Sequence, residues 1–165
     1  MRYLASLVLI AICFMACKTD PEKPPINREL GAVAQKPSQA SIKQALQEAG
    51  YETFDYIDSQ TGDTVLMQQY FIAFLKSGPV RSQSKAEADS LQTLHLAHLG
   101  RMYEEGHADI SGPFGDDGEI RGITIYNTPT LEMADSLANL DPMVRSGRLV
   151  IEIHPWWAAK GFSLR

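Results

Sequence analysis

Two residues of this sequence could exchange a proton with a ligand near neutral pH. His95 lies near the middle of the apolar face of an expected helix, and Asp141 precedes Pro142 where a later helix should end. Burial disfavours a charged imidazole, whereas a neighbouring carboxylate favours it and fixes which ring nitrogen carries the proton. Such a pair could serve as a general acid or base. The residues alone leave open that His95 is only a core residue and Asp141 only a turn former.

A metal site is the second possibility, because several potential ligands lie on or near the same helix. The residues that could form it are His95, His98, His107, His154, Glu104 and Asp109. The sequence contains no HExxH motif, no cysteine cluster and no pattern of two histidines with one carboxylate. We therefore expect no metal and no cofactor, and we expect His98 to pack close to His95.

Turn, aromatic and basic residues could form the walls of a pocket. Arg81 follows a Gly-Pro pair, and its planar guanidinium suits a carboxylate or an enolate. Glycines let backbone N–H groups approach a ligand, and aromatic side chains form walls, although Gly-Pro pairs also end strands and a tryptophan pair also covers a core. The sequence has no G-x-S-x-G, Walker or G-x-G-x-x-G motif, so the common hydrolase, nucleotide and dinucleotide motifs are excluded. The candidate substrate-binding residues are Arg81, Gly112, Pro113, Phe114, His98 and Trp156.

The elements that would position these residues lie between residues 65 and 157. Expected strands cover 65–76, 108–114, 120–126 and 148–154, and expected helices cover 84–105 and 128–141. Ser84 with Glu87 forms a capping box for the first helix, and Thr128 before Pro129 should cap the second. The order predicts an α+β fold, a ferredoxin-like βαββαβ sandwich. With helices on one face of the sheet only, a second copy could cover the other face, so we expect a homodimer.

The first long helix should bury one arc of its surface. On a helical wheel the apolar residues of this arc surround His95, and His98 lies one turn further along. The apolar residues of the arc are Ala88, Leu91, Leu94, Leu99 and Met102.

The N-terminal residues indicate an export signal and a spacer. Residues 4–15 form an apolar run that is too short to cross a bilayer as a helix, which favours a secretory signal ending at Ala16. Cys17 then resembles the cysteine of a bacterial lipobox, with Phe14 where leucine is usual; a conventional signal with a free thiol and an uncleaved apolar tail remain open. Residues 18–37 hold four of the nine prolines and predict a solvated spacer. Ser41 should cap a short helix that Gly50 ends, before a possible strand over 53–58.

Several motifs, in order, resemble the YCII-related (YciI-like) family. They are the run 94–99 around His95, Gly112-Pro113-Phe114 before Asp117-Gly118, Asp141-Pro142-Met143-Val144 with Gly147, and Glu152-Ile153-His154-Pro155-Trp156, together with residues 78–83 after the first strand. The resemblance covers residues 65–157. It implies a dimeric ferredoxin-like α/β barrel in which His95 and Asp141 form an active-site pair, and relatives that act on small ring-like organic acids or quinones by proton abstraction with elimination or isomerisation. An exported member would be a departure from an intracellular metabolic role.

Length and charge agree with a small domain and an appendage. The chain has 165 residues and a formal net charge of −5, which argues against nucleic acid as a partner. We expect a signal peptide (1–16), a lipid anchor site with a proline-rich tether (17–40), an accessory helix and strand (41–64), the YCII-like domain (65–157) and a tail (158–165).

Two functions are consistent with this organisation. The first is a protein anchored through lipid on Cys17 to the periplasmic or outer side of a bacterial membrane, which uses the His–Asp pair for lyase or isomerase chemistry on a small organic molecule. The second is a non-catalytic module of the same fold that binds a small molecule or scaffolds envelope components.

Overall fold

The computed structural model describes residues 37–162 and 164 of the chain. The predicted signal peptide, Cys17 and most of the predicted spacer lie outside these residues. The elements, in chain order, are α1 (Gln39–Glu48), β1 (Thr53–Ile57), β2 (Thr64–Ser77), α2 (Lys85–Glu104), β3 (Ala108–Pro113), β4 (Ile120–Tyr126), α3 (Leu131–Ala138), α4 (Pro142–Arg145) and β5 (Leu149–Ala159). None of the helices in the described part of the chain is long and apolar enough to cross a membrane.

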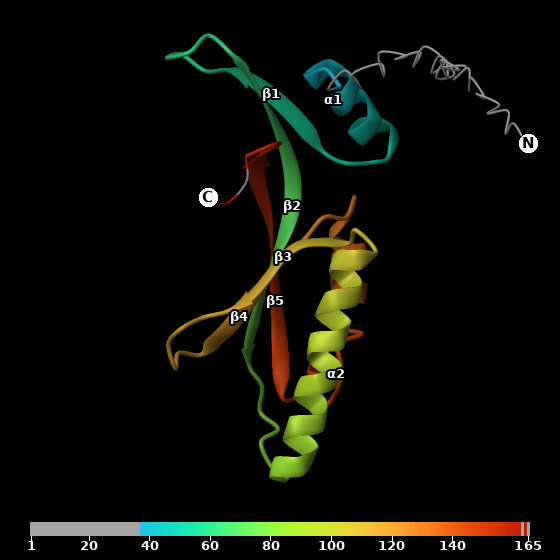
Figure 1. Ribbon diagram of the computed structural model, residues 1–165, viewed down its shortest axis with the longest axis vertical. Helices are drawn as coiled ribbons and strands as arrows, with labels where there is room; N and C mark the ends of the chain where they lie inside the picture. Colours follow the sequence, from blue (N-terminus) through green and yellow to red (C-terminus); the bar gives the residue numbers. More distant parts are fainter. Residues whose placement is uncertain (1–36, 163, 165) are drawn as a thin grey trace, which may run out of the picture. The chain divides into compact units, whose positions relative to one another are not determined.

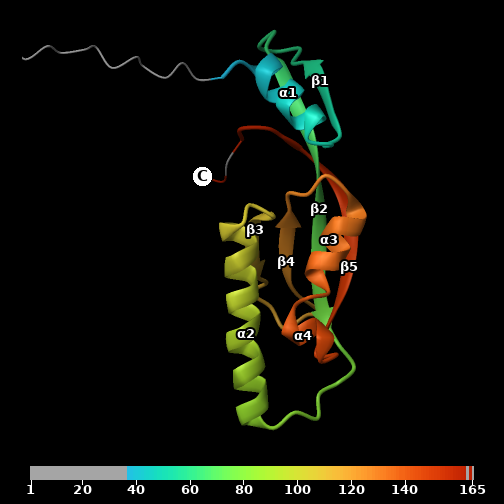
Figure 2. The same cartoon turned by 90° about the vertical axis from the view of Figure 1, so that its right-hand side faces the viewer.

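The strands form one antiparallel sheet around β2. Strand β5 pairs with β2 on one side, β4 pairs with it on the other, and β3 lies outside β4. Figures 1 and 2 show α2, α3 and α4 on one face of this sheet. From β2 onwards the chain therefore follows the β–α–β–β–α–β order, with α4 as an additional turn of helix, and the predicted α+β ferredoxin-like arrangement is confirmed.

Strand β2 changes its buried face half-way along. Its first half buries Leu66 and Tyr70 on one side, whereas its second half buries Phe71, Ala73 and Leu75 on the side that faces the helices. The strand predicted over residues 65–76 is confirmed, and over this second half the helices cover one of its two faces. Ala73 has no exposed surface, and it belongs to a core of helix and strand residues: Phe71, Met102, Ala108, Tyr126, Ala134 and Ala138.

The segment before β2 is part of the same unit. Strand β1 pairs with residues 64–68 of β2, so it occupies the stretch of β2 that β4 leaves unpaired. The Tyr51 hydroxyl donates a hydrogen bond of 3.1 Å to the backbone carbonyl of Asn127, which connects the loop before β1 to the end of β4. Gly50 ends α1 with a positive φ of 85°, as predicted. The helix begins earlier than expected, because Ser38 and not Ser41 is its N-cap.

Helix α2 has the predicted capping box, and its buried face agrees with the predicted one except at Leu94. The Ser84 side chain accepts from the Glu87 N–H, and the Glu87 carboxylate accepts from the Ser84 N–H. The buried residues of this helix are His95, His98 and Met102, whereas Leu94 is 50% exposed. The prediction placed Leu94 in the buried arc because a wheel weights apolar side chains, but the helix packs on the sheet through the stripe that carries the two histidines.

The start of the second predicted helix is also corrected. Thr130, not Thr128, caps α3 by accepting from the Met133 N–H at 3.2 Å. Thr128 is buried, and its hydroxyl donates to the Thr130 carbonyl. Two threonines flank Pro129, so the sequence is consistent with either one as the cap. The cap is Thr130, because its hydroxyl is the one that reaches a free N–H of the helix.

Candidate functional site

The side chains of His95 and Asp141 form a buried pair. The His95 Nδ1 atom lies 2.5 Å from the Asp141 Oδ2 atom, and both residues are buried. His95 comes from the middle of α2, and Asp141 lies 46 positions later in the chain. The fold brings them together because α2 and α4 pack on the same face of the sheet.

The backbone of α4 fixes the position of the Asp141 carboxylate. Asp141 is the N-cap of α4, and its Oδ1 atom accepts a hydrogen bond of 2.8 Å from the Met143 N–H. Pro142 follows at the first helical position. The backbone N–H of this position makes no hydrogen bond within a helix, so a proline costs nothing there. One carboxylate oxygen is thus occupied by the helix, and the other is aimed at His95.

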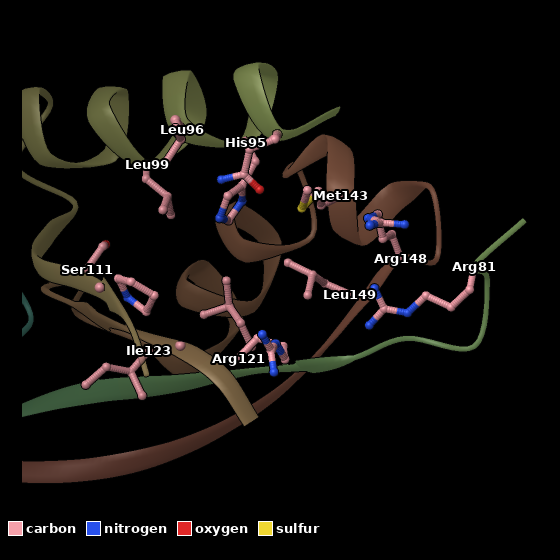
Figure 3. Close-up of a pocket in the computed structure, with 15 residues that line it drawn as sticks. Arg81, His95, Leu96, Leu99, Ser111, Arg121, Ile123, Met143, Arg148 and Leu149 are labelled. Atoms are coloured by element: carbon pink, nitrogen blue, oxygen red, sulfur yellow. The ribbon is translucent and has the colours of Figure 1, made fainter. Parts of the chain in front are cut away.

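This geometry determines the tautomer of His95. An ionised carboxylate only accepts hydrogen bonds, so Nδ1 of the imidazole carries a proton and donates it to Asp141. In the neutral ring the lone pair is then on Nε2. Figure 3 shows the imidazole reaching from α2 into a pocket, so its free nitrogen is available to a bound molecule. The arrangement suits removal of a proton from a ligand, and the carboxylate would stabilise the imidazolium that forms.

The pocket beside His95 has a volume of about 410 Å³. It lies between α2 and the sheet. Its other walls come from strands β2, β3, β4 and β5 and from helix α4. A cavity of this size accommodates a small organic molecule. The residues that line it are Leu75, Arg81, Gln92, His95, Leu96, Leu99, Ser111, Gly112, Pro113, Arg121, Gly122, Ile123, Met143, Arg148 and Leu149.

His98 is fully buried and does not line this pocket. Its Nδ1 atom is 3.2 Å from the Arg101 guanidinium, which can only donate, so the proton of the neutral ring is on Nε2. This Nε2 atom has no hydrogen-bond partner among the described residues. Burial lowers the pKa of His98, and the nearby charge of Asp141 opposes that shift. His98 is therefore a neutral residue of the interior at neutral pH.

Tyr126 is a second titratable group near the pair. It is buried in the core beneath the helices. Burial raises the pKa of its phenol, and the negative charge of Asp141 raises it further. Tyr126 is consequently protonated at neutral pH, and it adds no charge to the site there.

Two basic residues of the pocket were not predicted from the sequence. Arg121, at the start of β4, and Arg148, directly before β5, line the same pocket as the predicted Arg81. Each stands next to a glycine, Gly122 and Gly147, and this pairing of a basic residue with a small one at a strand end was the available signal. It is a weak signal, because arginines next to glycines are common in loops.

The structure places the other predicted binding residues in different locations. Gly112 and Pro113 line the pocket. Phe114 does not line it and is 44% exposed beyond the end of β3. Strand β5 continues to Ala159 and does not end at His154, so Trp156 is a residue of the strand. Side chains alternate between the two faces along a strand, and Trp156 lies on the face opposite the helices. There it pairs with Tyr70 and contributes to a second cavity of about 610 Å³.

No metal site is formed by the described residues. Within residues 37–162 and 164, no group of three or more histidine, cysteine, aspartate or glutamate side chains could hold a metal ion. Of the histidines considered as ligands, His154 instead contacts Glu152 at 2.8 Å on the exposed side of β5.

Comparison with known proteins gives a limited likeness. No model of a known protein family matches the chain, and no curated protein matches it either. Among solved structures, it is similar to the 5-chloro-2-hydroxyhydroquinone dehydrochlorinase TftG of Burkholderia phenoliruptrix AC1100, in a complex with 2,5-dihydroxybenzoquinone. The sequence identity is 18% and the TM-score is 0.42, over 53% of this chain and 92% of that one. The reaction has to be inferred from the site of this chain itself.

Proposed function

We propose that this protein binds a small organic molecule and transfers a proton to or from it through His95, in a lyase or isomerase type of reaction. The observation that supports the proposal is the hydrogen bond of 2.5 Å between a buried carboxylate and an imidazole that lines a pocket of about 410 Å³. A pair buried only for stability would not need an opening to a cavity on the other side of the ring.

In the proposed reaction His95 acts as the general base. Its Nε2 atom takes a proton from the ligand, Asp141 holds the imidazolium, and the electron pair left on the ligand moves to an oxygen or expels a leaving group. Arg81 is suited to stabilise a developing oxyanion, because its guanidinium presents several donors to the pocket, and Arg121 and Arg148 line the same pocket. The imidazolium then returns the proton to the product or to water.

Proton exchange tests this proposal without knowledge of the substrate. Small carbonyl acids and quinols would be incubated in D2O with wild type, His95→Gln and His154→Gln proteins, and the loss of C–H signals would be followed by NMR. We expect wild type and His154→Gln to accelerate exchange of at least one compound and His95→Gln to be slower by about 10²–10⁴-fold. Equal exchange rates with all three proteins would contradict the proposal, and binding without exchange would favour the non-catalytic module.

We further propose that the protein is exported and held at a membrane by lipid on Cys17. The support is the sequence alone, namely an apolar run of signal length followed directly by Ala16 and Cys17. Two acyl chains would anchor a protein stably. Intact-mass analysis of the membrane fraction tests this proposal, since wild type should carry the lipid and Cys17→Ser should not.

A further inference from the structure

Three guanidinium groups face the pocket beside His95. They belong to Arg81 in the loop after β2, Arg121 in β4 and Arg148 before β5. Figure 3 shows them on the side of the pocket away from Leu96 and Leu99, with His95 between the two sides. None of the described residues that line the pocket is acidic. A chain with a formal net charge of −5 has therefore concentrated positive charge in one cavity.

The charges of these arginines are largely uncompensated within the protein. Among the described residues, the Arg81 side chain has no hydrogen-bond or ion-pair partner. Arg148 donates to the neutral Gln83 side chain at 3.1 Å. Arg121 donates to the Gly118 backbone carbonyl at 3.1 Å and lies 3.7 Å from the carboxylate of Asp117, which is fully exposed, and such surface pairs contribute little. The pocket thus presents three guanidinium charges to whatever enters it, and the only carboxylate bonded to one of its lining side chains among the described residues, apart from the exposed Asp117, is Asp141 behind the His95 ring.

The charge of the pocket constrains its ligand. Three guanidinium groups around one small cavity repel one another, and a ligand with a single negative charge would leave most of that repulsion in place. A ligand with two negative charges removes more of it and can occupy more of the planar donors at once. The other side of the cavity, formed by Leu96 and Leu99 of α2, is apolar and suits a hydrocarbon body.

We infer that the ligand of this pocket is a small organic dianion with an apolar body, such as a dicarboxylate or a phosphate monoester. This inference rests on the proposed function for the placing of the substrate next to His95. The arginines bind the two negative charges, and the apolar side holds the carbon skeleton where His95 can reach it. Nε2 of His95 then removes a proton from this skeleton, and the adjacent arginines stabilise the additional negative charge that the removal creates.

Matched pairs of probes test the charge requirement by titration calorimetry at low salt. Phenyl phosphate is compared with benzenesulfonate, and phthalate with benzoate, at about pH 8, where a phosphate monoester carries close to two charges. We expect the dianion of at least one pair to bind about tenfold or more tightly than its monoanion, and we expect added salt to reduce the difference. Preference in the first pair alone indicates a phosphate monoester, and preference in the second alone indicates a dicarboxylate.

Variants link the preference to the arginines. Arg81→Gln, Arg121→Gln and Arg148→Gln should each reduce dianion binding, whereas the control Arg145→Gln, an exposed arginine of α4 that does not line the pocket, should not. Thermal unfolding of each variant excludes loss of the fold as the cause. Arg81 is exposed, so its substitution should affect the stability of the fold least.

The inference and the proposed function fail in different ways. His95→Gln should keep the dianion preference and lose proton exchange. Equal binding of dianions and monoanions, no measurable binding of either dianion, or a preference that survives all three pocket substitutions would overturn the inference while leaving the exchange result intact.

Discussion

At the level of single residues, Asp141 has two tasks that substitutions can separate. Its Oδ1 atom caps α4 through the Met143 N–H, and its Oδ2 atom accepts the proton of His95 Nδ1. Asparagine caps a helix as well as aspartate does, but its single carbonyl oxygen cannot serve both partners. With the oxygen on the Met143 N–H, the amide nitrogen faces His95, so the ring must accept there and the proton moves to Nε2.

We therefore predict different outcomes for two variants of Asp141. Asp141→Asn should remain folded with nearly wild-type stability and lose proton exchange by about 10²–10⁴-fold, because its imidazole has the wrong tautomer. Asp141→Ala should lose the exchange and also about 1–3 kcal/mol of unfolding free energy, because the cap is gone. Chemical denaturation and the D2O exchange assay measure the two effects. If Asp141→Asn exchanged protons at the wild-type rate, the carboxylate would have no role in the chemistry.

His98 should make the stability of the protein depend on pH. Burial lowers the pKa of the folded-state imidazole from its ordinary value of 6.5. The unfolded chain then binds a proton near that pH that the folded chain does not bind, so the free energy of unfolding should fall as the pH decreases below 6.5, by up to about 1.4 kcal/mol per pH unit. His98→Gln should remove this contribution, and the exposed His154→Gln should retain it. Denaturation curves on either side of this pH measure the difference, and the same slope in wild type and His98→Gln would contradict the prediction.

The sequence reveals some site residues and not others for a physical reason. A histidine within an apolar stripe and an aspartate before proline are locally unusual, so His95 and Asp141 could be named as candidates from the sequence, and the structure adds that their side chains pair. Arg121 and Arg148 are ordinary residues at strand ends, and only the pairing of β4 and β5 on either side of β2 brings them to one cavity. Trp156 shows the converse, because a locally unusual residue lies on the far face of the sheet.

At the level of elements, the close approach of the end of β2 to the start of β5 positions the arginine loop. The Gly78 N–H donates to the Arg148 carbonyl at 2.9 Å, and the Val80 N–H donates to the Gly147 carbonyl at 3.1 Å. A Cβ atom at Gly78 would lie 2.2 Å from the Gly147 carbonyl oxygen, which is backbone and cannot rotate away. This contact fixes the loop that carries Arg81 beside Arg148.

Gly78→Ala should consequently destabilise the protein and weaken the pocket. We expect the free energy of unfolding to decrease by about 1–3 kcal/mol, as for other overpacked sites, and dianion binding to decrease with it. Gly100→Ala is the matched control, because a Cβ atom there meets nothing within 4 Å and alanine favours the interior of α2 by about 0.5–1 kcal/mol. Denaturation of both variants measures the difference, and a neutral Gly78→Ala would show that the two strand ends can separate.

The elements themselves are predictable where a local pattern defines them. Alternation and apolar runs located all four strands of the ferredoxin-like core, and the Ser84–Glu87 box located the start of α2. The short helix α4 was not predicted, since its four residues form a single turn and Asp141-Pro142 is equally typical of a plain turn. The length of β5 was also underestimated, because Pro155 interrupts the pattern although the strand continues through it.

At the level of the whole molecule, the face of the sheet opposite the helices carries a partly open apolar area around Trp156, whereas Lys76, Glu152 and His154 lie further along the same face. Ile110 is 37% exposed and Trp156 is 41% exposed, and both line the second cavity on this face. Ile125 and Tyr70 lie in the same cavity and are buried, and its lining also includes Asp109 and Lys160, whose ammonium donates to the Tyr70 hydroxyl at 3.1 Å. A face of this kind is commonly covered by a partner, and a second copy offers an identical apolar face to pair with it.

We predict that the protein is a homodimer through this face. Trp156→Glu and Ile110→Glu should each convert it to a monomer, because each removes an apolar side chain from the interface and puts there a carboxylate whose burial is costly. Leu94→Glu is the control, since this half-exposed leucine lies on α2, on the helical side of the sheet. Light scattering after size exclusion measures the mass of each protein. A monomeric wild type would show that the apolar face remains uncovered, and a dimer that both glutamate variants leave intact would place the interface elsewhere. Because His95, Asp141 and the three arginines lie on the helical side, the monomeric variants should keep the dianion preference, so assembly and ligand recognition can be measured independently.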